Sequence, residues 1–261
     1  EILNKVVSSI DFNVLLMILG TMGTVSFFIE SKMPHMISDY IILKAKSIKM
    51  MTLFLALFAG IVSAFVDNVA TVLMIAPVTL AVAKKLNVSP IPIILSVSIF
   101  SNLDSAATLV GDTTSILLAG AMKLNFMDFF FYEGRIGLFF VVQLGLLAAL
   151  LILYFIMRNF NTRIKDNEVS KVSDYVPTIL LSLTIITLIV ASFIPNKPDI
   201  TNGLICTVYF IIGAIIKIIR EKKFSSIIPN LKELDFSTIL LLASLFVIIA
   251  GVKEVGAIDM I

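Results

Sequence analysis

An acidic residue and an amide, Asp67 and Asn68, stand between two apolar runs that are each too short to cross a membrane. Residues 50–66 lead into this pair and residues 69–83 lead out of it. A helical run of roughly 10–15 residues, at ~1.5 Å per residue, reaches only the middle of a bilayer. The pattern therefore predicts a re-entrant hairpin over residues 50–84. Because backbone at that depth must be covered by protein or line a wet cavity, we expect Asp67 and Asn68 to form half of a binding site.

The composition is that of an integral membrane protein. Hydrophobic residues make up 59% of the chain and charged residues 15%, whereas soluble domains have about 45–50% and ~25%. Long apolar runs without strand-like alternation predict an all-α membrane protein. A single cysteine and a single histidine exclude an intramolecular disulfide and a multi-histidine metal site. We expect Cys206 to pack as a small apolar residue and His35 to lie at the interface.

Further apolar and polar stretches predict the order of the membrane segments. A broken helix is expected over 89–122, because its apolar run is interrupted between residues 101 and 115 by Ser, Asn, Asp, Thr and Gly. The other expected segments are a first span at 12–29, an interfacial helix at 33–49, spans at 136–157, 176–194, 202–219 and 236–252, a polar loop at 158–175 and a connector at 220–233. The Phe-rich run 126–132 is typical of a lipid-facing or interfacial belt.

The distribution of basic residues predicts an orientation. Counting one crossing per span puts fifteen of the twenty Lys and Arg residues on the side where the hairpin begins and ends. The positive-inside rule makes that side cytoplasmic. We therefore expect a multi-pass protein of a bacterial-type cytoplasmic membrane, with the N-terminal end of the first span outside and the hairpin entering from the cytoplasm.

A weak internal repeat predicts two copies of one unit. Asp11-Phe12 matches Asp235-Phe236 at an offset of 224 residues, and Glu30 falls on Glu254 at the same offset. The crossing count places the two copies in opposite directions, as in inverted-repeat secondary transporters. The expected units are a first repeat over 1–233 and the start of a second over 234–261. A chain that opens on Glu1 and ends inside an apolar segment is expected to be a piece of a longer polypeptide.

Two motifs resemble one known family. The stretch Phe65-Val-Asp-Asn-Val-Ala-Thr-Val-Leu-Met-Ile-Ala-Pro-Val-Thr79, with Ser101-Asn102 and Ala107-Thr-Leu-Val-Gly-Asp112, resembles the ion transporter superfamily. The most similar branch contains arsenite permeases, the melanocyte P-protein and sodium/proton antiporters, and is related to citrate-transporter-like domains and dicarboxylate carriers. The resemblance implies a scaffold, a mobile transport subdomain, a homodimer and an elevator motion.

The resemblance also implies which residues bind the substrate or coupling ion. The hairpin-tip residues carry over to Asp67, Asn68 and Thr71, and those of the broken helix to Ser101, Asn102, Thr108, Gly111 and Asp112. The sequence departs from the usual Gly-Gly-Thr and Pro-Pro-Asn, with Leu103-Asp-Ser-Ala106 and Thr113-Thr-Ser115 in their places. Asp104 is thus an extra carboxylate beside the site, which favours a cation or proton pathway over an anionic substrate.

Several functions fit these residues. We expect a secondary transporter of a small ion coupled to Na⁺ or H⁺, with Asp67, Asn68, Ser101 and Asn102 as possible Na⁺ ligands. Cation/proton antiport and transport of arsenite or a dicarboxylate both stay open. An ATPase partner would be needed only by an arsenite pump, since the chain has no phosphate-binding Gly-rich loop. No enzyme activity, cofactor or nucleic acid is expected. The rival is a non-transporting half-length subunit or scaffold, and Asp67 and Asp112 are then only helix caps.

Overall fold

A computed structural model describes residues 9–160 and 172–254 of the chain. Nearly all of its regular structure is helical. The elements are α2 Phe12–Glu30, α3 Met33–Lys44, α4 Ile48–Ser63, α5 Asn68–Lys85, α6 Ile91–Asp104, η1 Ser105–Ala107, α7 Thr113–Met122, η2 Phe126–Phe129, β1 Phe131–Tyr132, β2 Arg135–Ile136, α8 Leu138–Ile156, η3 Met157–Asn159, α9 Val176–Ser192, α10 Thr201–Glu221, η4 Phe224–Ile227, α11 Ile228–Glu233 and α12 Phe236–Glu254.

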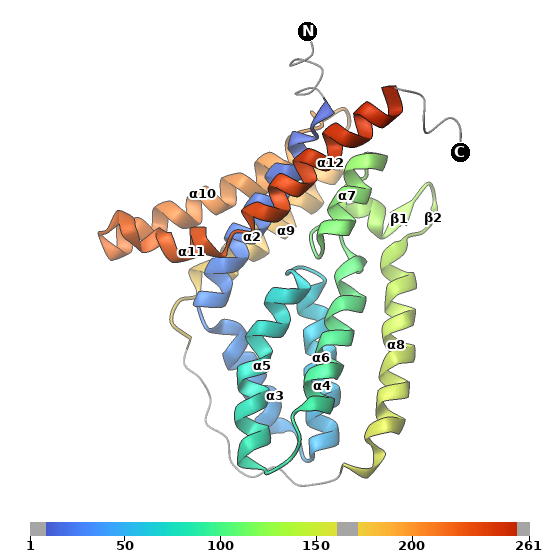
Figure 1. The fold of residues 1–261 in the computed structure, drawn as a ribbon, viewed down its shortest axis with the longest axis vertical. Coiled ribbons are helices and arrows are strands. Elements are labelled where there is room, and N and C mark those ends of the chain that lie inside the picture. Colours follow the sequence, from blue (N-terminus) through green and yellow to red (C-terminus); the bar gives the residue numbers. More distant parts are fainter. Residues whose placement is uncertain (1–8, 161–171, 255–261) are drawn as a thin grey trace.

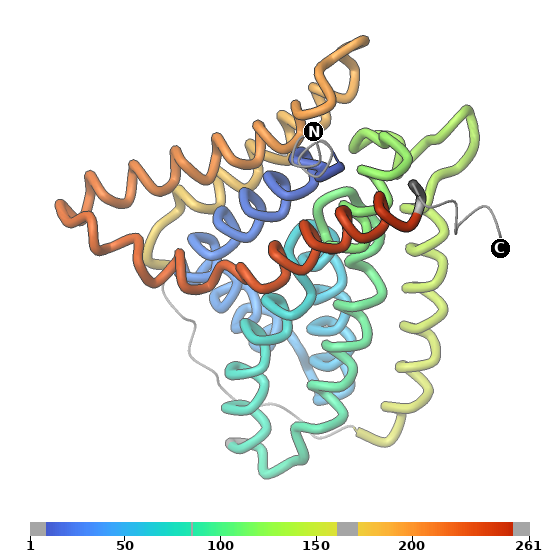
Figure 2. The backbone as a smooth tube through the Cα atoms, turned by 45° about the horizontal axis from the view of Figure 1, so that its top comes forward, coloured from blue at the N-terminus to red at the C-terminus, as the bar shows by residue number. Residues whose placement is uncertain are grey.

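The helices form two groups that cross each other (Figure 1). Helices α4, α5, α6 and α8 run up and down as a bundle, and α3 packs against α4 and α5. Helices α2, α9, α10 and α12 lie obliquely across the upper end of that bundle, an arrangement also clear in Figure 2. The hairpin between α4 and α5 turns where the two groups meet, so its tip is in the middle of the molecule.

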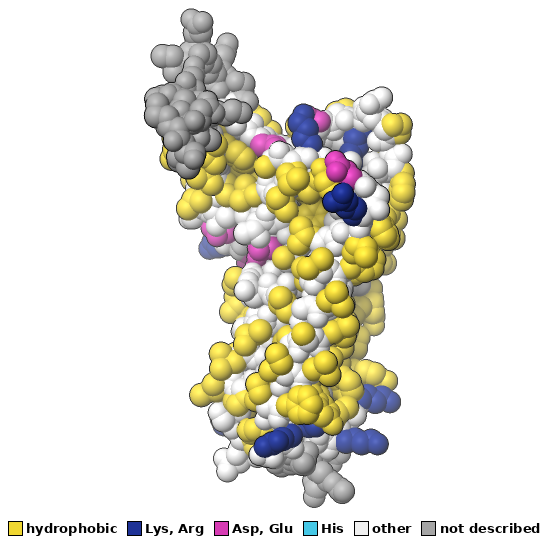
Figure 3. Space-filling view, turned by 90° about the vertical axis from the view of Figure 1, so that its right-hand side faces the viewer, with side chains coloured by type: hydrophobic (Ala, Val, Ile, Leu, Met, Phe, Trp, Pro, Cys, Tyr) yellow, Lys and Arg dark blue, Asp and Glu magenta, His cyan; other side chains and the backbone are white. Residues whose placement is uncertain are grey.

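Helix lengths agree with a membrane protein that has both spanning and shorter segments. In the part of the chain that the structure describes, α2, α8 with η3, and α10 are long and apolar enough to cross a bilayer. The region of η4 and α11 joins α12 with a bend of 57°, and this bent pair would be a fourth span. Helices α4, α5, α6, α7 and α9 are apolar but shorter. Figure 3 shows basic side chains gathered at the lower end of the bundle, where α4 begins and α5 ends.

Close backbone contact joins α2 to α10 in the oblique group. A Cβ added at Gly20 would lie 2.3 Å from the carbonyl carbon of Cys206. Only a glycine allows the two backbones to approach so closely, which is how membrane helices gain packing energy without a hydrophobic driving force. Cys206 is fully buried there, so the prediction that it packs as a small apolar residue is confirmed.

An ionic cluster holds the ends of the same helices. The Lys217 ammonium of α10 lies 2.6 Å from both carboxylate oxygens of Glu30 and 2.8 Å from the side-chain oxygen of Asn230. The Asn230 amide in turn donates to Glu30 at 3.0 Å. Three helices, α2, α10 and α11, are thereby tied together at the side predicted to be cytoplasmic. Helix α12, which follows, runs antiparallel to α2 (Figure 1).

Some predicted boundaries differ from the structure. The segment 33–49 is not one helix: α3 ends at Lys44 and α4 begins at Ile48, because Ser47 takes extended backbone and its hydroxyl accepts from the Met50 N–H. The run 126–132 is only partly a belt. Phe126 and Phe129 are buried in the core, where they pack with α2 and α7, and a short β-hairpin follows.

Candidate functional site

Asn68 and Asn102 meet at the tip of the hairpin. The Asn68 amide nitrogen donates to the Asn102 side-chain oxygen at 2.8 Å, and the Ser101 hydroxyl donates to the Asn68 backbone carbonyl at 3.1 Å. Asn68 is the first residue of α5, whereas Ser101 and Asn102 lie near the end of α6. The structure therefore brings together three of the predicted site residues, from two segments more than thirty residues apart in the chain.

The breaks in the two segments are locked to each other. The Thr108 hydroxyl, fully buried, donates to the Ala64 carbonyl at the end of α4. Gly111 packs on the same turn, and a Cβ there would lie 2.4 Å from the Ser105 carbonyl oxygen and 2.7 Å from that of Ala64. Thr108 and Gly111 thus join hairpin and broken helix by backbone contact, and neither faces the groove beside Asn68.

The break in the second segment is shorter than predicted. Helix α6 continues through Asp104 and the 3₁₀ turn η1 through Ala107, so irregular backbone covers only 108–112 instead of 101–115. The polar side chains that suggested an earlier end find partners without breaking the helix, since the Ser105 hydroxyl donates to the Asn102 carbonyl. Helix α7 then starts at Thr113.

Asp67 faces away from Asn68 and Asn102. Its carboxylate accepts the Ala70 N–H at 3.1 Å, so Asp67 is the N-cap of α5, as the alternative interpretation held. The side chain lines a groove of about 630 Å³ between the hairpin and the oblique helices, together with residues of α2, α3 and α12. It also lines a small cavity against α2 that includes Gly111 and Asp112. The Asp112 carboxylate accepts the Thr114 hydroxyl at 2.6 Å.

Asp104 does not face Asn68 and Asn102 either. It is 1% exposed and its carboxylate accepts the Gln143 amide of α8 at 2.6 Å, beside Gly60 of α4. The carboxylate therefore fixes α8 to the bundle. The sequence argument that Asp104 favours a cation over an anionic substrate loses its basis, because the charge is on the far side of α6. Sequence reasoning also missed Gln143, whose only signal is an amide inside a long apolar span.

Two buried hydroxyls beside the tip have no hydrogen-bond partner. They belong to Ser63, the last residue of α4, and to Thr71, in the first turn of α5, and both side chains are 0% exposed. A buried polar atom without a partner costs about 1–3 kcal/mol, so each needs an explanation. Hydroxyl, amide and carbonyl oxygens are ligands that hard cations prefer. Thr71 was predicted from the sequence, whereas Ser63 was not.

The site lies open on one side. Asn102 is exposed, and with Asn68 it lines a shallow groove on the outer surface of α5 and α6 whose other walls are apolar, including Val72, Leu73 and Ile99. In the described part of the chain no group of three or more His, Cys, Asp or Glu residues could hold a metal ion. Any cation held here would therefore be bound by neutral oxygens or by at most two carboxylates.

Comparison with known proteins identifies the family. Residues 2–261 match the citrate transporter family CitMHS, which is almost the entire chain. The chain belongs to the citrate transporter family. This confirms the predicted resemblance to the ion transporter superfamily and to citrate-transporter-like domains.

Bacterial relatives of this citrate transporter family member are described as transporters. An uncharacterized transporter of Mycobacterium tuberculosis is 28% identical over 260 residues, 97% of the chain and 58% of the relative. P protein of Mus musculus is 31% identical over 177 residues, which are 65% of the chain and 20% of that protein. An uncharacterized transporter of Synechocystis is 23% identical over 249 residues, with coverage of 94% and 55%. The chain thus spans little more than half the length of the bacterial relatives.

Proposed function

We propose that the chain supplies the first half of the binding site of a secondary active transporter, which moves a small ion coupled to Na⁺ or H⁺. The observation that carries the proposal is the contact of Asn68, at the hairpin break, with Ser101 and Asn102 in the last turn of α6, just before the second break. Transporters place substrate and coupling ions at such breaks, where half-helix ends and freed carbonyls are available. Family membership supports the same proposal.

The oxygens at the tip support a coupling cation. The Ser63 and Thr71 hydroxyls have no partner, and the Asn102 amide oxygen accepts one hydrogen bond, from Asn68, which leaves it a lone pair. Na⁺ bound by these neutral oxygens would satisfy the hydroxyls. Asp67 lies on the other face of the tip, where a carboxylate can exchange a proton for a cation. Coupling to Na⁺ uses the first set of atoms, and coupling to H⁺ uses the second.

The substrate can be an organic anion as well as a cation. Three helices begin close to the tip, α5, α7 and α12, and helix N-termini favour anions. The family is described as citrate transporters, which supports a carboxylate substrate. Because Asp104 faces α8 and not the groove of Asn68, its charge does not oppose an anion there.

We propose an elevator motion of the bundle against the oblique group. The glycine contact of α2 with α10 and the cluster at Lys217 make the oblique group rigid, as a scaffold must be. The hairpin meets that scaffold through apolar side chains, Val66 of the tip against Val25 and Phe28 of α2. Moving the hairpin along α2 would cost little free energy at this contact, because it contains no ion pair to break. A homodimer formed through the scaffold follows from this proposal.

The exposed half-site needs a second polar surface to enclose an ion. That surface would come from a second copy of the repeat in the same polypeptide, or from another subunit, as the rival half-length interpretation holds. The mass of the protein purified from its own membrane separates the two. A mass well above 28.6 kDa supports the second repeat, and a mass near 28.6 kDa supports the subunit.

The transport proposal is tested with the purified protein in proteoliposomes. Uptake of labelled citrate and of ²²Na⁺ is measured under an imposed Na⁺ or pH gradient for the wild type and for Asn68→Ala and Asn102→Ala. Asn159→Ala, an exposed asparagine outside the site, is the matched control. We expect both site variants to lose uptake while the control keeps it. Wild-type uptake by Asn68→Ala and Asn102→Ala together would refute the assignment of the site.

A further inference from the structure

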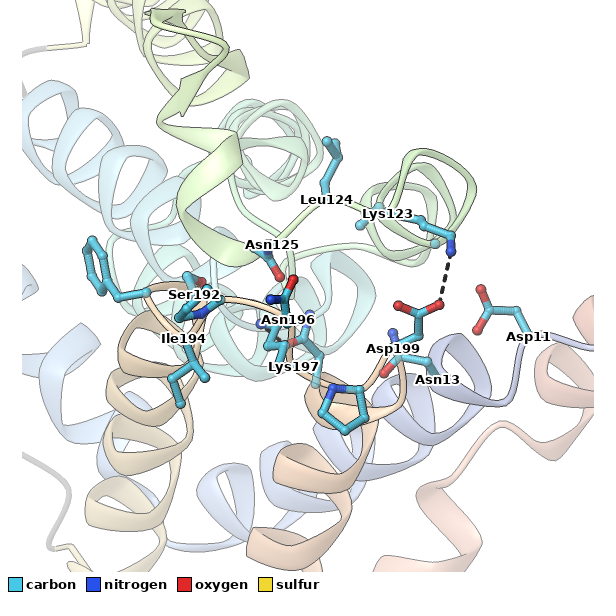
Figure 4. A pocket seen from close by; sticks show the side chains of 16 residues that line it. Asp11, Asn13, Lys123, Leu124, Asn125, Ser192, Ile194, Asn196, Lys197 and Asp199 are labelled. Atoms are coloured by element: carbon cyan, nitrogen blue, oxygen red, sulfur yellow. Dashed lines mark hydrogen bonds and ion pairs between the residues drawn. The ribbon is translucent and has the colours of Figure 1, made fainter.

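A polar cavity lies at the opposite end of α7 from the hairpin tip. It has a volume of about 450 Å³ and is formed by the first residues of α2 and α10, the end of α7 and the loop after α9 (Figure 4). Small-molecule sites usually have ~300–1,000 Å³. Helix α7 has ten residues, so at ~1.5 Å per residue the cavity is about 15 Å from the Asp112 break. By the crossing count it opens on the side away from the cytoplasm.

The carboxylates around this cavity already have partners. Asp11 caps α2 by accepting the Val14 N–H at 3.1 Å, and Asp199 forms an ion pair with Lys123 at 3.0 Å. Asp128, which lies behind the lining, accepts the Asn125 N–H at 2.6 Å. In Figure 4 the Lys123–Asp199 pair and Asp11 lie on one side of the cavity. Each of these carboxylates is therefore engaged within the protein, and the charge of Asp199 is balanced by Lys123.

Lys197 is the charged group without such a partner. Its ammonium is half-buried and donates to the Asn202 side-chain oxygen at 3.1 Å, and Asn202 is itself 5% exposed. Within residues 9–160 and 172–254 no carboxylate lies within ion-pair distance of Lys197. An ammonium has three N–H donors, so two stay free. Burial lowers the pKa of Lys197, although the charge of Asp128 opposes that effect, and a bound anion would offset the cost of the buried charge.

Amide donors surround this ammonium. Asn125 and Asn196 lie beside Lys197 on the same side of the cavity (Figure 4). The Asn125 side-chain oxygen is used in a capping box, so its NH₂ group is available. Likewise the Asn13 oxygen accepts the Gly203 N–H at 2.7 Å, and its NH₂ group makes only a long contact, of 3.9 Å, to the Met17 sulfur. One free cation with several N–H donors is the arrangement that binds a carboxylate by charge-assisted hydrogen bonds.

We propose that this cavity is a second binding site, which takes a small carboxylate anion through Lys197 and the surrounding asparagine amides. It would collect the anion on the extracytoplasmic side, one half-helix away from the hairpin tip. The inference does not depend on which ion the tip binds, since it concerns binding and not movement.

The test uses the purified full protein without a gradient. Lysines are acetylated with acetic anhydride in the presence of succinate, citrate or chloride, and each lysine is quantified by peptide mass spectrometry. We expect succinate or citrate to protect Lys197 at concentrations at which chloride does not, while Lys84, at the other end of the molecule, is acetylated equally in all three. Equal acetylation of Lys197 in all three solutions would overturn the proposal.

Equilibrium binding of labelled succinate and citrate provides the second measurement. Lys197→Gln should weaken binding at this site by about tenfold or more, the value of one charge-assisted hydrogen bond. Lys197→Arg should restore most of it, because the charge returns. The matched control is Lys84→Gln, which removes a lysine at the other end of the molecule. Unchanged binding in Lys197→Gln, or preferential binding of alanine over succinate, would refute an anion site. Loss of uptake by a protein in which the anion still protects Lys197 from acetylation would count only against the transport proposal.

Discussion

Replacing Thr108 with Val tests whether the two helix breaks are held together by one hydrogen bond. Valine keeps the shape of threonine but cannot donate to the Ala64 carbonyl. It also removes the acceptor for the Val110 N–H at 3.4 Å. Thr108 is 0% exposed and Ala64 3% exposed, so no water replaces the lost donor. Thr108→Val therefore leaves a buried carbonyl without a partner.

The expected cost follows from that orphaned carbonyl. Leaving a buried acceptor unpaired costs about 1–3 kcal/mol, whereas side-chain hydrogen bonds between membrane helices average only ~0.6 kcal/mol. Because Ala64 is the C-cap of α4, where carbonyls lack a helical N–H partner, we expect about 1–2 kcal/mol. Thr79→Val is the control, since Thr79 is equally buried in the same hairpin but donates to the Ile75 carbonyl within its own helix. That carbonyl keeps its helical N–H partner, so the control should cost less than ~0.6 kcal/mol.

The assay is reversible unfolding of the full protein in mixed micelles by titration with SDS, with uptake measured on the same preparations. We expect Thr108→Val to lose stability and uptake together, because the geometry of both breaks depends on the same bond. Equal free energies of unfolding for Thr108→Val and Thr79→Val would refute the reasoning. A destabilised Thr108→Val with normal uptake would show that the bond stabilises the fold but does not shape the site.

Three further perturbations address other contacts. Gly111→Ala should lower the free energy of unfolding by about 1–3 kcal/mol and abolish uptake, since its Cβ would lie 2.4 Å from a backbone carbonyl oxygen. The control is Gly145→Ala, whose Cβ would meet only the Leu103 side chain, at 3.8 Å, and which should resemble the wild type in the same unfolding titration. Lys217→Met should lower the free energy of unfolding by about 1–3 kcal/mol because it leaves the carboxylate of α2 facing a buried amide, and a double-mutant cycle with Glu30→Gln should recover part of that loss. Burial tends to raise the pKa of Asp174, but the Val176 N–H and the Arg220 guanidinium outweigh it and hold that pKa below its usual value. The stabilisation by Asp174 is therefore present at neutral pH and lost as the pH falls through the lowered pKa, below about pH 4. It should be under ~1 kcal/mol, because the ion pair of Asp174 with Arg220 is exposed. Arg220→Gln should therefore reduce the loss of unfolding free energy at acid pH in a stability–pH curve.

The positions of the helix breaks could be predicted from the sequence because they depend on local chemistry. An acidic residue and an amide between two short apolar runs mark the turn at 64–67, and the structure has α4 end at Ser63 and α5 begin at Asn68. Gly111 marks the second break for the same reason, since only glycine fits against the backbone of the hairpin. The predicted break was too long because serine hydroxyls can bond to carbonyls of their own helix and leave it intact.

The directions of the carboxylates could not be predicted from the sequence. Asp67 and Asn68 are neighbours, yet one caps α5 toward α2 and the other reaches α6. Asp104 and Asn102 are two residues apart on a helix, so they face different sides, and only the position of Gln143 on α8 decides that Asp104 is paired. Such choices depend on neighbours more than thirty residues away. The same is true of Lys197, which looks in the sequence like an ordinary charged residue in a turn.

The proposed elevator motion predicts where polar and apolar contacts should lie in this chain. Two ion pairs join helices of the oblique group to each other or to the residues just before α9: Lys217 with Glu30, and Arg220 with Asp174. A third and exposed pair, Lys123 with Asp199, joins the end of α7 to the loop before α10. The buried Asp104, by contrast, is used inside the bundle, where it joins α6 to α8. Between the two groups the hairpin tip presents Val66 to Val25 and Phe28. At the hairpin tip the contact between the two groups is therefore apolar, which agrees with the proposed sliding motion there, whereas movement of α7 relative to α10 would break the exposed Lys123–Asp199 pair.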